Sequence, residues 1–197
     1  IRALRHHGGA KKDEYGNASV ERVSIGFANL EKHIGNMKKF GLTPVVAINH
    51  RTGDTEEEIK IVKEKCAALG VNAVVSKGWA DGGNGAQDIA QAVVDSIESG
   101  TNNFKRLYDW NAPVIEKIET IAREIYGADG VDFAAKAKRD LKGIENLGLA
   151  HLPICMAKTQ KSFSDNDKLV NRPTGFKVTV REFEIAAGAG FLIPILG

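Results

Sequence analysis

Two helix–strand units follow one another early in the chain, and this alternation limits the folds that the chain can adopt. Apolar residues recur at steps of three and four over 20–37 and again over 59–69, as they do on one face of a helix. A short apolar run follows each helix pattern, at 44–49 and at 71–75. Such runs are typical of strands that are buried on both faces of a parallel sheet, which helices join. We therefore predict a parallel α/β sheet with flanking helices.

Capping residues mark the expected boundaries of these elements. Thr55 and Glu58 form a capping box at the start of the second helix, and Gly41 and Gly70 are suited to ending the two helices. A glycine-rich stretch at 78–85 precedes a further helix pattern. We assign residues 1–102 to this first portion, with a sheet of the P-loop NTPase-like or Rossmann-like kind.

The pattern changes in the second half of the chain. Helices are predicted over 114–125 and 133–144, and a buried strand over 152–157. Alternating apolar residues over 176–185 shift phase once, which predicts a strand with a bulge or bend. We expect a smaller mixed α/β portion over residues 103–197, truncated at its C-terminal end.

Composition excludes several classes of function. The net charge of +2 and the scattered Lys and Arg residues argue against a nucleic-acid surface. No apolar run is long enough to span a bilayer, so no membrane partner is expected. Cys66 and Cys155 both lie in apolar surroundings and are predicted to be buried free thiols, and with no signal peptide visible the protein is expected to be cytoplasmic.

Polar and aromatic residues follow both predicted strands at their carboxyl ends, where open parallel sheets bind ligands. Asn49 and Asp54 come after the first strand, and Trp79 and Asp81 come after the second. We predict that the two loops flank one crevice.

Each of these residues has a structural alternative. Asp54 and Thr55 are equally suited to capping a helix. Trp79 could be a buried core residue, although its small and polar neighbours favour stacking on a ligand. Residues 158–160 leave the predicted strand at 152–157 and could either contact an anion or be solvated.

Signals for a metal or for catalytic groups are weak. His6 and His7 have no partner ligands at zinc-like spacing, so no metal is predicted. The glycine run at 82–85 lacks the Lys-Ser/Thr ending of a P-loop, and spacing identifies no nucleophile–base pair. Catalytic residues are therefore left unassigned.

Taken together, several segments resemble the ATP-dependent formate–tetrahydrofolate ligases, also called 10-formyltetrahydrofolate synthetases. The run RALRHHGG at 2–9 is similar to the end of a family signature, with Arg5 in place of its usual Lys. The resemblance continues in order along the chain, at 26–34, 45–49, 79–83, 117–122, 125–130, 152–160 and 180–191.

The resemblance implies an enzyme of one-carbon metabolism. Its substrates would be formate, MgATP and tetrahydrofolate, with no tightly bound cofactor, and the enzyme would be a cytosolic homotetramer. In the family, the P-loop that binds ATP belongs to an N-terminal region, which we expect to be missing here. We therefore expect the isolated chain to be inactive.

The resemblance also implies a folate site. In the family, the pterin ring lies between the Trp of a Trp-Ala-x-Gly-Gly loop, which Trp79 matches, and the Phe of an Asn-x-Phe-Pro-Thr-Asp-Thr loop. This chain has Arg51 where that Phe stands and Thr52 where the Pro stands, while Asp54 is retained. Because a planar guanidinium replaces an aromatic ring only partly, we expect weaker folate binding than is usual.

The resemblance assigns the remaining polar groups less specifically. Asn49, Lys158, Thr159 and Gln160 are candidates for contacting an anion or nucleotide. Two other interpretations stay open. One is a non-catalytic module that binds folate or a protein partner, and the other is a different carboxylate-activating ligase of the P-loop type, such as a dethiobiotin-synthetase-like enzyme.

Overall fold

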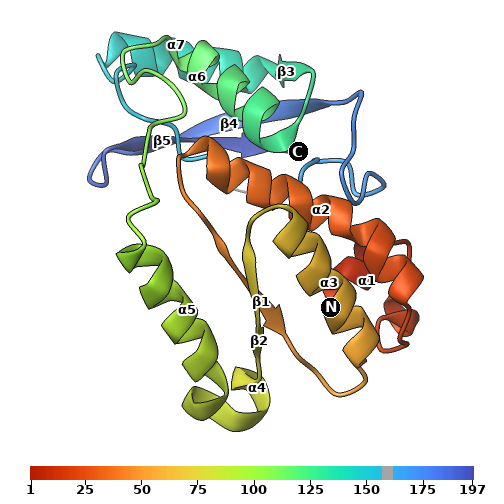
Figure 1. Ribbon diagram of the computed structural model, residues 1–197. Coiled ribbons are helices and arrows are strands. Elements are labelled where there is room, and N and C mark those ends of the chain that lie inside the picture. Colours follow the sequence, from red (N-terminus) through yellow and green to blue (C-terminus); the bar gives the residue numbers. More distant parts are fainter. Residues whose placement is uncertain (157–161) are drawn as a thin grey trace. The chain divides into compact units, whose positions relative to one another are not determined.

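The computed structural model describes residues 1–156 and 162–197, which form two compact units, Ile1–Lys105 and Arg106–Gly197 (Figure 1). Each unit combines helices with a small sheet that contains parallel strands, so the predicted α/β class is confirmed. The assignment of domains to 1–102 and 103–197 stays a prediction. None of the helices in the described ranges has both the length and the apolar composition needed to cross a bilayer.

The first unit consists of the two predicted helix–strand repeats with short helices before and after them. Strands β1 and β2 pair in parallel, from Val45 opposite Asn72 to Asn49 opposite Ser76. Helices α2 and α3 lie on one side of this pair and α5 lies on the other (Figure 1). The elements are α1 (Arg2–His7), η1 (Lys12–Glu14), α2 (Val20–Lys39), β1 (Val45–Asn49), α3 (Glu56–Ala68), β2 (Asn72–Ser76), α4 (Gly78–Asp81), η2 (Gly82–Ala86) and α5 (Gln87–Glu98).

The predicted capping box of α3 is confirmed. The Thr55 hydroxyl accepts a hydrogen bond from the Glu58 N–H at 3.3 Å, and Glu58 Oε2 accepts one from the Thr55 N–H at 3.0 Å. The predicted helix ends are also confirmed, since Gly41 and Gly70 follow α2 and α3 with φ angles of +73° and +67°.

The prediction that both strands of this unit are fully buried is wrong. Ile48 is the only buried residue of β1, and β2 has none. Each strand has a single neighbour in the described two-stranded sheet, and the core lies mainly among the helices on one side of it. The buried core residues are Leu4, Val23, Phe27, Ile34, Ile48, Ile59, Val62, Cys66 and Val71.

Helices α1 and α2 make backbone contact through two glycines. A Cβ atom at Gly26 would lie 1.9 Å from the Leu4 carbonyl oxygen, and one at Gly8 would lie 1.9 Å from the Arg22 carbonyl oxygen. No other residue type fits at either position without separating the helices. The close approach buries Arg5, which α1 carries toward α3.

The second unit has a three-stranded sheet covered by two helices. Strand β4 lies between β3, which is parallel to it, and β5, which is antiparallel. Helices α6 and α7 lie side by side over one face of the sheet (Figure 1). The elements are α6 (Val114–Ile121), the π-helical turn η3 (Ala122–Tyr126), β3 (Gly130–Phe133), α7 (Ala135–Asn146), β4 (Lys177–Ala186) and β5 (Phe191–Leu196).

The shift of phase predicted over 176–185 is confirmed as an irregularity of β4. The register with β5 shifts between Val180 and Glu182. Val180 and Phe183 are therefore both buried although they are an odd number of residues apart.

The helix predicted over 133–144 is confirmed as α7, but it begins at Ala135, and Phe133 belongs to β3, opposite Val180. Two other predictions in this unit are wrong. The segment expected to form a strand over 152–157 makes only one isolated bridge, from Ile154 to Leu192, in its described part. Cys155 is exposed, whereas Cys66 is buried as predicted.

Buried Lys117 explains why the start of that segment is not extended. Its Nζ donates hydrogen bonds to the carbonyl oxygens of Ala150, His151 and Leu152 at 3.2, 3.3 and 3.1 Å. Successive carbonyl groups of a strand point in alternating directions and cannot converge on one ammonium group in this way. The charge of Lys117 therefore holds a turn at this position.

Two glycines of α2 provide a matched test of the contact between α1 and α2. We expect Gly26→Ala to lower the free energy of unfolding by about 1–3 kcal/mol, because the added methyl group collides with the backbone of α1. Gly35→Ala adds a methyl group that meets nothing within 4 Å, so it should raise stability by about 0.5–1 kcal/mol. Urea denaturation of both variants checks this, and equal effects would show that the helices are not in contact.

Candidate functional site

The carboxyl ends of β1 and β2 lie side by side and form one rim of the first unit. Asn49 pairs with Ser76 in the parallel register, and the His50 N–H donates a hydrogen bond to the Ser76 carbonyl at 3.0 Å. The loop after β1 and the loop after β2 therefore start from adjacent points, as required for the predicted crevice.

Arg51 and Trp79 meet at this rim. The Arg51 guanidinium carbon lies 4.6 Å from the centroid of the Trp79 ring, which is the geometry of a cation–π contact. The indole is 67% exposed and is therefore not part of the core. The structure therefore brings together two of the residues predicted to bind folate, and it places their side chains against each other.

The loop after β2 is closed by its own backbone. The Lys77 N–H donates a hydrogen bond to the Gly85 carbonyl at 2.9 Å, and α4 with Trp79 lies between these residues. A Cβ atom at Gly85 would lie 2.5 Å from the Lys77 carbonyl carbon, so the closure requires glycine there. The glycine-rich stretch thus forms a compact turn that presents the indole.

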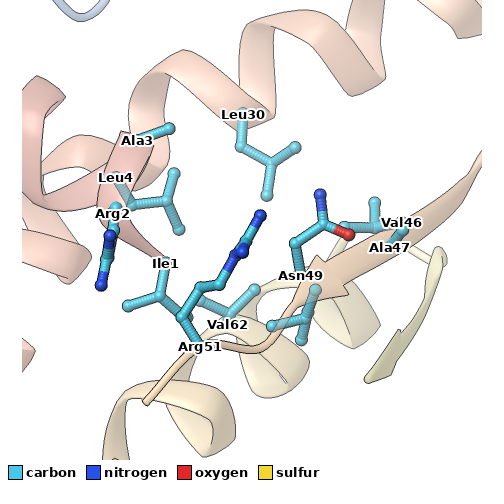
Figure 2. Close-up of a pocket in the computed structure, with 11 residues that line it drawn as sticks. Ile1, Arg2, Ala3, Leu4, Leu30, Val46, Ala47, Asn49, Arg51 and Val62 are labelled. Atoms are coloured by element: carbon cyan, nitrogen blue, oxygen red, sulfur yellow. The ribbon is translucent and has the colours of Figure 1, made fainter. Parts of the chain in front are cut away.

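A cavity of about 550 Å³ adjoins Arg51 on the side of α1 and α2. Most of its wall is apolar and comes from α1, α2, β1 and α3, while Arg2, Asn49 and Arg51 supply its polar groups. Figure 2 shows the Arg51 side chain extending into the cavity toward Leu30, with the Asn49 amide beside it. None of the described residues that line the cavity is acidic, so it suits a ligand that is partly apolar and partly anionic.

A second cavity, of about 520 Å³, has a different character. His50 and Lys77, from the same two loops, line it, but neither Asn49 nor Arg51 does. Its wall carries both signs of charge, from Lys63 and Lys77 and from acidic residues on α3, α4 and α5. Asn49 and Arg51 therefore line the first cavity, whereas His50, which lies between them in the chain, lines the second.

Asp54 and Thr52 occupy opposite environments in the loop after β1. Thr52 is exposed at the tip of the loop. The Asp54 side chain has no exposed surface, and its Oδ2 accepts a hydrogen bond from the Arg51 N–H at 2.8 Å. A direct contact of Asp54 with a ligand stays a prediction, and it would require the carboxylate to turn outward.

Arg5 lies at the centre of the contacts that hold this loop. Its side chain is fully buried, and Nε and Nη2 donate to the two carboxylate oxygens of Glu58 at 2.8 and 2.5 Å. The guanidinium also donates to the carbonyl oxygens of Tyr15 and Gly53 at 2.8 and 3.1 Å, and Nη2 lies 3.1 Å from Asp54 Oδ1. Sequence reasoning did not find Arg5, because nothing local distinguishes it from a solvated helix residue.

The environment of Glu58 favours its ionised form. Burial alone would raise the pKa of this carboxyl group. The hydrogen bonds from Arg5 and from the N–H groups of Thr55 and Ser19 outweigh burial, and they lower the pKa of Glu58 to about 2. Glu58 therefore stays charged at every pH at which the protein is expected to work.

The other candidate residues are placed as follows. Asn49 is exposed at the end of β1, whereas Lys158, Thr159 and Gln160 lie outside the described residues. His6 Nδ1 lies 2.6 Å from the Tyr15 hydroxyl. Within the described ranges, no three His, Cys, Asp or Glu side chains are grouped so that they could hold a metal ion.

Comparison with known families gives one result. A family model described as formate–tetrahydrofolate ligase matches residues 1–197. The match extends over the whole chain, including the loops that carry Arg51 and Trp79.

The low pKa of Glu58 predicts acid sensitivity. Between pH 4.5 and about 2, the unfolded state binds a proton at Glu58 that the folded state does not, so stability falls as the pH falls through this window. We expect Glu58→Gln to lower the free energy of unfolding at neutral pH by about 3–5 kcal/mol, because it leaves Arg5 buried with less compensating charge. The variant should also lose part of the pH dependence.

Urea denaturation at pH values from 7 to 2.5 measures both effects. Glu57→Gln changes an exposed residue of the same helix and serves as the control. If the two variants have the same stability and the same pH dependence, Glu58 does not hold the charge that we assign to it.

Proposed function

The chain belongs to the formate–tetrahydrofolate ligase family, and we propose that it forms the folate-binding part of an enzyme that joins formate to tetrahydrofolate at the expense of ATP. The match over residues 1–197 supports this proposal. We further propose that β1 and β2 belong to a P-loop NTPase-like, Rossmann-like sheet, since ligands of such sheets bind beyond the carboxyl ends of the strands.

The proposed reaction has two steps. A formate oxygen attacks the γ-phosphate of MgATP, and ADP leaves with formation of formyl phosphate. The N10 amine of tetrahydrofolate then attacks the formyl carbon, phosphate leaves, and the amine loses a proton. Residues 1–197 contain no Gly-x4-Gly-Lys-Ser/Thr sequence, so we assign phosphoryl transfer to residues outside them.

The observation that carries the folate assignment is the exposed indole of Trp79 under the Arg51 guanidinium. The pterin ring of tetrahydrofolate is flat and would stack on the indole face. A ring between two planar groups needs about 7 Å between them, from two contacts of about 3.5 Å. Arg51 must therefore move away from Trp79 to admit the ring, or the ring must use the opposite face of the indole.

The other residues of the rim have supporting roles in this proposal. Thr52 offers a hydroxyl group at the exposed tip of the loop. Asn49 and Arg51 provide polar groups within the cavity of about 550 Å³, where they can bind an anionic part of a substrate. Lys158, Thr159 and Gln160 are proposed to contribute further anion contacts.

The alternative function is a module that binds folate or a protein partner without catalysis. The same exposed rim supports it, because binding needs only the loops of the first unit. An assay of formate-dependent ADP release by residues 1–197 distinguishes the ligase from the non-catalytic module. We expect none, because no P-loop sequence is present to bind the nucleotide.

The two tryptophans of the chain provide a matched test of the folate site. We expect Trp79→Ala to weaken the binding of tetrahydrofolate, measured by calorimetric titration, by about 1–3 kcal/mol, as loss of a stacked base does elsewhere. Trp110→Ala is the control, because Trp110 is also partly exposed and also lies under a guanidinium, that of Arg106 at 3.9 Å, but it belongs to the second unit.

Arg51→Phe adds a second expectation. Because it restores the residue of the family pattern and removes the cation–π contact, it should tighten the binding of tetrahydrofolate. Equal losses in the two tryptophan variants, or no binding by the unmodified chain, would reject the proposed site.

A further inference from the structure

We propose that Asp54 and Arg5 are positioning residues, which act through the backbone of the loop after β1 to hold Arg51 over Trp79. This inference concerns the conformation of the free protein, and only its consequence for ligand binding rests on the proposed function. Among the described residues, Arg51 makes the cation–π contact with the Trp79 ring, so we expect Asp54 and Arg5 to act on the indole through Arg51.

Two hydrogen bonds join Arg51 and Asp54 across a tight turn. The Arg51 N–H donates to Asp54 Oδ2 at 2.8 Å, and the Asp54 N–H donates to the Arg51 carbonyl at 3.0 Å. Gly53 lies between them with φ of +91°, a conformation that side-chain-bearing residues rarely adopt. The backbone of Arg51 is therefore fixed by the Asp54 carboxylate.

That carboxylate depends in turn on Arg5. Asp54 Oδ1 is buried and has no hydrogen bond within the described part of the chain. The positive charge nearest to it is Arg5 Nη2, at 3.1 Å. The same nitrogen donates a hydrogen bond to the Gly53 carbonyl at 3.1 Å, so Arg5 contacts the turn at two adjacent residues, Gly53 and Asp54.

A buried carboxylate oxygen without a hydrogen bond is unfavourable unless a nearby charge compensates for it. Arg5 supplies that charge from a fixed place, since its Nε and the same Nη2 also donate hydrogen bonds to the two carboxylate oxygens of Glu58. Removal of the charge on Asp54 should therefore release the turn, and the Arg51 side chain should then leave the indole.

The consequence for the proposed site is order in its free state. A turn that holds Arg51 beside Trp79 keeps one face of the indole covered in the free protein. A ring that stacks on that face must first displace the Arg51 side chain, whereas a ring that uses the opposite face leaves the contact in place.

Quenching of Trp79 fluorescence by acrylamide tests the inference without any ligand. In a Trp110→Phe background, Trp79 is the only tryptophan. Arg51→Ala uncovers one of the two faces of the ring and should raise the quenching constant by about twofold. Asp54→Asn should also raise the quenching constant. In the double variant, Asp54→Asn should add nothing to the effect of Arg51→Ala, because the two act on the same contact.

Two further variants keep the test decisive. Val23→Ala removes a buried methyl pair from the core of the same unit and should leave quenching unchanged, which separates positioning from general loss of stability. If Asp54→Asn does not fold, Arg5→Lys takes its place, since it keeps the charge but loses the planar fork that reaches both the turn and Glu58.

Two outcomes overturn the inference. One is an unchanged quenching constant in a folded Asp54→Asn or Arg5→Lys variant. The other is an equal increase whether or not Arg51 is present, which would mean that the whole loop has loosened. Titration of the same variants with tetrahydrofolate is a separate measurement. If the chain does not bind folate, the proposed function is rejected, but the conclusion from quenching is unaffected.

Discussion

The first unit depends on one buried guanidinium. Arg5 joins α1 to α3 through Glu58, and it joins both helices to the turn at 51–54 and to the carbonyl of Tyr15. The two-stranded sheet could not fix these segments alone, because its strands are only half buried. A buried ion pair adds little stability, but it favours one conformation, since its hydrogen bonds can be satisfied in one arrangement only. Here that arrangement sets the course of the loop that carries Arg51.

The candidate site follows from two loop closures. On one loop, Asp54 and Arg5 hold the turn next to Arg51. On the other, the hydrogen bond from Lys77 to Gly85 closes the turn that presents Trp79. Because the parallel register places the ends of β1 and β2 side by side, the two side chains meet at the rim. In the free protein the Arg51 guanidinium therefore covers one face of the indole.

The sequence reveals those features that depend on near neighbours. The capping box at Thr55 and the phase shift before Phe183 were both readable, because their signals extend over a few residues. The exposure of Trp79 was inferred correctly from the small residues around it. The roles of Arg5 and Lys117 were not readable. The partner of Arg5 is 53 residues away, and the carbonyl groups that hold Lys117 are at least 33 residues away.

Native-state hydrogen exchange tests the central role of Arg5 most directly. The N–H groups of Ser19, Arg51 and Thr55 come from separate segments, yet each donates to a carboxylate that Arg5 holds. If Arg5 unites these segments, the three amides should exchange with one common opening free energy, and Arg5→Lys should lower it equally for all three. Three different opening free energies, or a loss of protection at one amide alone, would contradict the account.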